Sequence, residues 1–118
     1  VNTFQALTQR FAGVPQEWLD TIAHQAHQAH AVLLKQSTAA ALVHCVQGLL
    51  HNWVEEDLLV LARPFAYAMR GQETEAIEAV FVSVQDREWT ALSEIEQARL
   101  SLAIARYALA EIDKKSTL

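Results

Sequence analysis

Residues 93–113, with the sequence SEIEQARLSLAIARYALAEID, carry apolar side chains on two sides of an expected helix. One stripe recurs at spacings of three and four, which is typical of a helix face packed on a neighbour; it consists of Ile95, Ala98, Leu102, Ala105, Leu109 and Ile112. A second stripe lies on roughly the opposite side at about 100° per residue and consists of Leu100, Ile104 and Tyr107. A helix that is apolar on both sides must be enclosed, either by its own domain or by a second copy of the chain. We therefore expect this helix to be the axis of the fold.

The composition of the chain favours helices throughout. The 118 residues suit one domain, residues 1–118, which is large enough for one apolar core. Only three glycines and two prolines are present, too few to supply the turns of a sandwich or a barrel. The sequence therefore predicts an all-α fold, a bundle of five to six helices around the helix at 93–113.

Apolar residues at helical spacing predict five helices before this axis. They cover, in chain order, residues 3–11, 16–33, 38–53, 55–69 and 74–84. Residues 36–38 are the expected break between the second and the third helix, with one long helix over 16–51 as the alternative. The run VFVSV at 80–84 also fits a strand, but the spacing of its apolar residues and the lack of a partner strand favour a helix.

Capping signals and a proline predict where several of these helices begin or bend. Asn52 followed by Glu55 resembles a capping box at the start of the fourth helix, and Ser93 followed by Glu96 forms a second one at the start of the axis. Pro64 falls inside the fourth helix, so we expect a kink or a restart near Arg63.

The charge pattern excludes several classes of protein. The formal net charge is −5, and the basic residues are scattered, so we expect no direct binding of nucleic acid. The longest run without a charged residue, 36–54, contains too many Gln, His and Asn residues for a membrane span. A single cysteine and the lack of a signal peptide predict a cytoplasmic protein without an internal disulfide.

Five histidines lie within residues 24–51, which raises the question of a metal site. Asp20, His24 and His27 share one side of the second helix, and carboxylate and imidazole groups at such spacing can hold a metal ion. That side is also opposite the apolar stripe, where polar residues belong in any case. The sequence has no HExxH and no CxxC motif. We therefore expect no cofactor and keep a metal or haem site as the alternative.

The histidine-rich segment also has a second unusual property. Between Thr21 and Val54 the only formal charge is Lys35, although a free helix surface usually carries more ions. Such a surface is typical of a contact region, because interface cores are depleted of charged residues. The candidate interface residues are the second stripe of the axis together with three histidines: Leu100, Ile104, Tyr107, His30, His44 and His51.

These observations favour a non-enzymatic helical protein that binds another protein or regulates one, as a homodimer, through exposed helix faces. No GxSxG, Walker A or GxGxxG motif is present, and Cys45 lies at the edge of an apolar stripe, where an inert thiol is expected. The alternative is a bundle that binds a metal, haem or a small molecule through the histidine-rich segment at 24–51.

Overall fold

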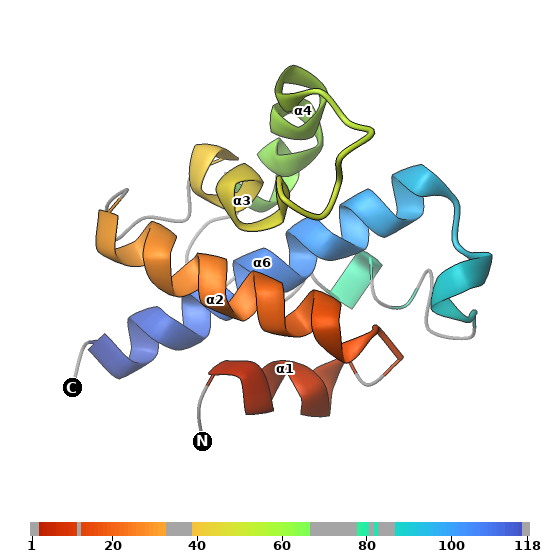
Figure 1. The fold of residues 1–118 in the computed structure, drawn as a ribbon. Coiled ribbons are helices and arrows are strands. Elements are labelled where there is room, and N and C mark those ends of the chain that lie inside the picture. Colours follow the sequence, from red (N-terminus) through yellow and green to blue (C-terminus); the bar gives the residue numbers. More distant parts are fainter. Residues whose placement is uncertain are drawn as a thin grey trace.

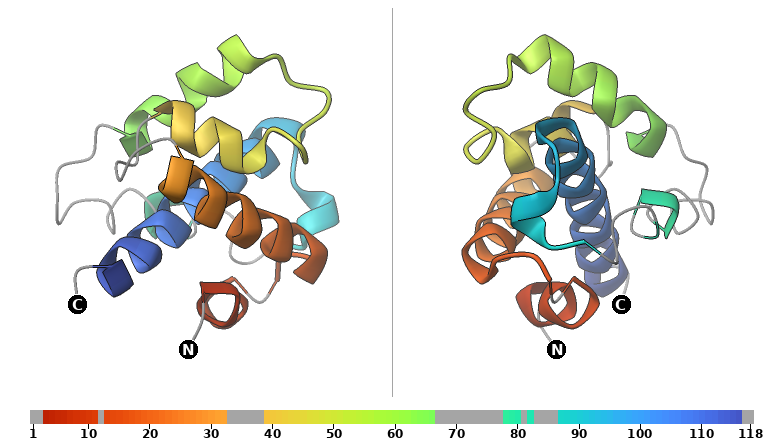
Figure 2. Two further views of the ribbon diagram at one scale, coloured as in Figure 1. Left: turned by 60° about the vertical axis from the view of Figure 1, so that its left-hand side comes forward. Right: turned by 90° about the vertical axis from the view of Figure 1, so that its right-hand side faces the viewer.

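The predicted axis is the central helix of the structure, a computed structural model that describes residues 3–11, 13–32, 39–66, 78–80, 82 and 87–116. This helix, α6 (Glu94–Ser116), has 23 residues and packs against the four preceding long helices. They are α1 (Thr3–Arg10), α2 (Gln16–Val32), α3 (Ala39–Val46) and α4 (Glu55–Ala66). A short 3₁₀ helix, η1 (Trp89–Ala91), comes just before α6. Figures 1 and 2 show the long helices arranged around α6, which confirms the all-α bundle.

Both apolar stripes of α6 are covered by the same chain. In the first stripe Ala98 and Leu102 are fully buried, and Ile95 is the exception at 43% exposure because it lies in the first turn of the helix. In the second stripe Leu100 is 4% exposed and Ile104 is fully buried. The sequence allows these side chains to be covered either by the chain's own domain or by a second copy of the chain. In the structure, the chain's own helices cover them.

The first two helices follow their predicted stripes. Leu7 and Phe11 of the N-terminal segment are buried, and the Phe11 ring meets Tyr107 of α6 edge to face, with 5.6 Å between ring centroids. In α2 the predicted positions Leu19, Ile22, Ala26 and Ala29 are all buried. Small residues there let α2 lie close to both α3 and α6, which it contacts.

The third helix is shorter than predicted. α3 ends at Val46, and the predicted extension to Trp53 is wrong, because turns follow at 47–49 and 51–52. The amide of Leu49 donates to the Val46 carbonyl at 2.9 Å, which is a tight-turn bond between residues three apart. Gly48 lies in this turn, and its low helix propensity is the physical reason for the early end.

The fourth helix has a different N-cap from the predicted one and passes through its proline. The Leu58 amide donates to the Val54 carbonyl at 3.2 Å, so Val54 is the N-cap and the predicted capping box at Asn52 is wrong. α4 continues past Pro64 to Ala66, so of the two outcomes predicted for this proline the restart near Arg63 is wrong and the kink stays a prediction. The carbonyl that loses its bond belongs to Val60, which lies at the exposed side of the helix where water can solvate it.

Two sequence predictions depend on residues that the structure does not describe. The expected break at 36–38 and most of the helix at 74–84 lie outside the described residues, although 78–80 and 82 are helical. α2 and α3 pack against each other, which one continuous helix over 16–51 does not permit. Among the described helices, none is both long enough and apolar enough to cross a lipid bilayer.

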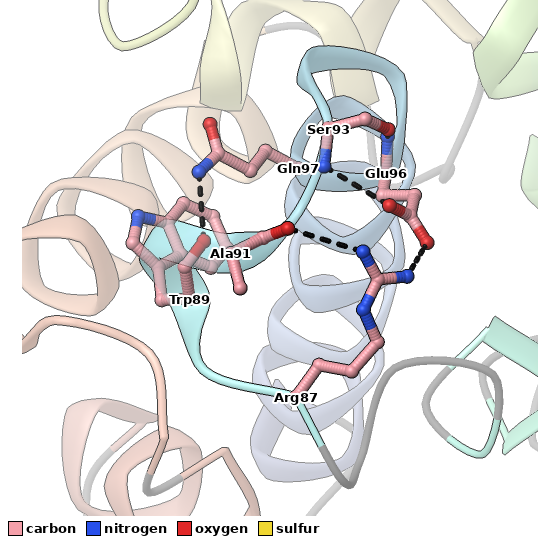
Figure 3. Close-up of polar contacts among 6 residues, drawn as sticks. All are labelled: Arg87, Trp89, Ala91, Ser93, Glu96 and Gln97. Atoms are coloured by element: carbon pink, nitrogen blue, oxygen red, sulfur yellow. Dashed lines mark hydrogen bonds and ion pairs between the residues drawn. The ribbon is translucent and has the colours of Figure 1, made fainter.

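The start of α6 is held by the predicted capping box (Figure 3). The Ser93 amide donates to Oε1 of Glu96 at 3.0 Å, and the Glu96 amide donates to Oγ of Ser93 at 3.2 Å. Arg87 forms an ion pair with Glu96 and donates to the Ala91 carbonyl at 3.1 Å. This arrangement fixes the turn through which the chain enters its central helix.

The burial of α6 predicts that two matched isoleucine-to-alanine substitutions in this helix lower the stability of the fold by very different amounts. Ile104→Ala removes side-chain volume from a fully buried position and is expected to lower the free energy of unfolding by about 2–5 kcal/mol. Ile95→Ala makes the same change at 43% exposure in the same helix and is expected to cost less than about 1 kcal/mol. Urea unfolding of the two variants measures the difference, and equal losses would contradict the enclosure of α6 by its own chain.

The capping box predicts a stability contribution that depends on pH. The hydrogen bond from the Ser93 amide, with help from Arg87, holds the pKa of Glu96 below its ordinary value of 4.5. A carboxylate with a lowered pKa in the folded state stabilises the fold above its unfolded pKa, and the contribution is lost as the pH falls through the folded pKa. Wild type is therefore expected to be more stable than Glu96→Gln at neutral pH. The difference in stability should disappear once the pH has fallen below the pKa of Glu96 in the folded state.

Glu94→Gln is the matched control for this measurement, because Glu94 is exposed in the same first turn and forms no hydrogen bond with a described residue. Thermal unfolding followed by circular dichroism from neutral to acidic pH compares the two variants. A Glu96→Gln curve parallel to that of wild type at every pH would show that the capping box does not act in this way.

Candidate functional site

The predicted metal candidates lie on the exposed side of α2. Asp20, His24 and His27 are all exposed, as is Glu17 one turn earlier. The Nε2 atom of His24 lies 3.4 Å from the side-chain nitrogen Nε2 of Gln28, a distance at the outer limit of a hydrogen bond. Within the described residues, no three His, Cys, Asp or Glu side chains come together as metal ligands would. The three candidates therefore form an open polar face rather than an enclosed site.

The three histidines of the predicted interface are placed differently. His44 is exposed on α3, and His51 is exposed in the turn that follows α3. His51 borders a polar cavity of about 120 Å³ whose lining also includes Trp18, Trp53 and Glu94. The side chain of His30 lies outside the described residues.

The three candidate interface residues of α6 are largely packed against other residues of the same chain. Leu100 and Ile104 are buried, so they offer no surface to a partner in this structure. Tyr107 is half-buried, and its ring packs on Phe11 of the N-terminal segment. A protein partner would instead meet residues outside the second stripe of α6.

The single cysteine is a core residue. Cys45 has no exposed surface and forms no disulfide. Burial disfavours the charged thiolate and raises the pKa of the thiol to about 12. The protonated thiol is a poor nucleophile and a poor metal ligand, which is consistent with the structural role expected from the sequence.

A polar network that sequence reasoning missed joins α2 to α6. The indole Nε1 of Trp18 donates to the Ser101 hydroxyl at 2.7 Å, and this hydroxyl donates to the Gln97 carbonyl at 2.7 Å. The Gln97 side chain donates to the Trp89 carbonyl at 2.9 Å (Figure 3). The rings of Trp18 and Trp89 meet at an interplanar angle of 62° with 5.0 Å between their centroids. The Ser101 hydroxyl thus accepts a hydrogen bond from a half-buried indole N–H and links α2 to α6.

The sequence contains only a weak signal of this network. Trp18 and Ser101 are separated by 83 residues, so no local spacing connects them. A serine at position 101, inside a helix that is otherwise apolar on both sides, is the one sign that a buried polar group needs a partner.

A second feature missed by sequence reasoning is an apolar groove of about 420 Å³. Among the lining residues that the structure describes, most belong to α4 and two to the helical residues 78–80, and Arg99 of α6 is the only charged one. Its apolar lining residues are Val60, Leu61, Pro64, Phe65, Ala79 and Val80. The three segments are far apart in the sequence, so helical periodicity alone does not bring them together.

Comparison of the chain with protein-family models, with curated proteins and with solved structures finds no match. The function therefore has to be argued from the surfaces of this chain. Two features stand out chemically: the exposed residues without a formal charge on α2 after Asp20 and on α3, and the apolar groove beside Arg99.

The Trp18–Ser101 hydrogen bond predicts a coupled loss of stability. Ser101→Ala leaves the Trp18 indole N–H without its acceptor and is expected to cost about 1–3 kcal/mol. Trp18→Phe removes the donor, so adding Ser101→Ala to it should cost about 0.5–3 kcal/mol less than the sum of the two single changes. Urea unfolding of the two single variants and the double variant measures this coupling, and strictly additive losses would rule the bond out as a source of stability.

Proposed function

We propose that this chain is a non-enzymatic interaction or regulatory protein of the cytoplasm that acts through exposed helix faces as a homodimer. The observation that carries the proposal is a set of exposed residues without a formal charge on α2 after Asp20, on α3 and in the turn that follows α3. We call it the α2–α3 surface; it consists of His24, His27, Gln28, Ala40, His44 and Gln47.

The chemistry of the α2–α3 surface supports a contact role. A helix that faces water usually carries Lys, Arg, Asp or Glu on its outer side, as α4 does with its three acidic residues at positions 55–57. The α2–α3 surface instead combines imidazole, amide and alanine side chains. Such groups form hydrogen bonds to a partner without the desolvation cost of a formal charge.

The packing of the two helices adds to the argument. α2 and α3 contact each other, and both pack on the core around α6. The exposed residues of the α2–α3 surface are thus carried by a rigid scaffold. A preorganised surface loses less conformational entropy when it binds, so this arrangement favours recognition of a partner.

The alternative function is the binding of a metal, haem or a small molecule through the histidine-rich segment at 24–51. It is supported by His24 and His27, which lie one turn apart on the exposed side of α2, as two ligands of one ion would. Titration with Zn²⁺ or Ni²⁺ separates the two functions, because a specific site raises the melting temperature and a surface for a protein partner does not.

The homodimer predicts that one added charge on the α2–α3 surface weakens self-association. Gln47→Glu places a carboxylate on this surface, and its desolvation in the dimer is expected to raise the dissociation constant about tenfold or more. Gln9→Glu is the matched control, because Gln9 is also exposed and near the C-terminal end of a helix, but on α1. Sedimentation velocity over a range of protein concentrations measures both variants.

The outcomes are distinct. A dimer in wild type and in Gln9→Glu, with a shift to monomer in Gln47→Glu, supports the proposal. A wild-type chain that stays monomeric at every concentration would remove the homodimer from it. A dimer that is unaffected by Gln47→Glu would place the interface away from the α2–α3 surface.

A further inference from the structure

We propose that the apolar groove between α4, the helical residues 78–80 and α6 binds a small amphipathic carboxylate. The apolar body of the ligand would lie along the groove and its carboxylate would meet Arg99. This site lies apart from the α2–α3 surface and adds a ligand to the function proposed above. The inference depends on the size of the groove, on its apolar described lining and on the charge of Arg99.

The size and lining of the groove fit a small ligand. Its volume of about 420 Å³ falls within the range of about 300–1,000 Å³ that is typical of small-molecule sites. Of the seven lining residues within the described part of the chain, six are apolar, and Val60 among them is 55% exposed. A ligand with an apolar body would therefore displace water from apolar side chains that the fold itself leaves accessible.

Arg99 determines the expected charge of the ligand. It is exposed on α6, and it forms no ion pair with a described residue, whereas Arg87 is paired with Glu96. The planar guanidinium matches a carboxylate through two parallel hydrogen bonds, and the neighbouring apolar surface strengthens such a contact. The same charge disfavours a cationic ligand of equal size. The lining thus selects a molecule that is apolar along its length and anionic at one end.

Titration calorimetry with octanoate, octanol and octylammonium tests this selectivity on the full chain. We expect saturable binding of octanoate with one site per chain, weaker binding of octanol and none of octylammonium. Arg99→Gln is expected to weaken octanoate binding about tenfold and to leave octanol binding unchanged. Arg63→Gln removes the same charge from an exposed position on α4 outside the groove and should leave octanoate binding as in wild type.

A second set of variants tests the location. Ala79→Trp fills the groove from an exposed lining position and is expected to abolish octanoate binding, whereas Ala40→Trp, an exposed alanine on α3, should not. Circular dichroism checks that both variants fold. If Ala79→Trp does not fold, Val60→Asp places a repelling carboxylate at an exposed position of the groove and should weaken octanoate binding instead.

Several results would overturn the proposal. They are no saturable binding of octanoate, equal binding of octanoate and octanol, or binding that survives both Ala79→Trp and Val60→Asp. Octanoate binding that falls as the protein concentration rises would assign the groove to a second copy of the chain and not to a small molecule.

Discussion

The enclosure of α6 by α1–α4 is the constraint on which the rest of the structure depends. An apolar helix with two apolar sides is stable in water only when both are covered, and four helices of the same chain contact this one. Ala98, Ala103, Ala105 and Ala108 have no exposed surface, so small side chains allow these neighbours to approach α6 closely. The aromatic contact of Phe11 with Tyr107 then brings the N-terminal segment against the same helix.

Features that depend on the local pattern of residues can be predicted from the sequence. Features that depend on contacts between distant segments cannot. Helical spacing predicts α6 and α2 well, and the Ser93–Glu96 capping box is present as predicted. The predicted end of α3 and the predicted N-cap of α4 are wrong, because Gly48 and the true N-cap, Val54, act through turns that apolar spacing does not encode. Helical spacing likewise cannot predict whether Ile104 packs against its own chain or against a second copy, because tertiary packing determines this contact.

The candidate sites follow the same division. The uncharged exposed residues of α2 and α3 can be recognised from the sequence, because both the stripe and the missing charges are local properties. The groove beside Arg99 cannot, since α4, residues 78–80 and α6 meet only in the folded chain. The two surfaces differ in chemistry: the first is polar and neutral, and the described lining of the second is apolar apart from Arg99. The residues of the α2–α3 surface are exposed, as are Val60, Ala79 and Arg99 of the groove, so both surfaces can be altered by substitution outside the core.

Hydrogen exchange of the α6 amides tests the central claim most directly. If α1–α4 enclose this helix, the amides of residues 98–109 open only with global unfolding, and their exchange free energies equal the free energy of unfolding measured with urea. Exchange of these amides within seconds under native conditions, or at the rate of the exposed turn at 47–49, would contradict the enclosure of α6 and with it the architecture described above.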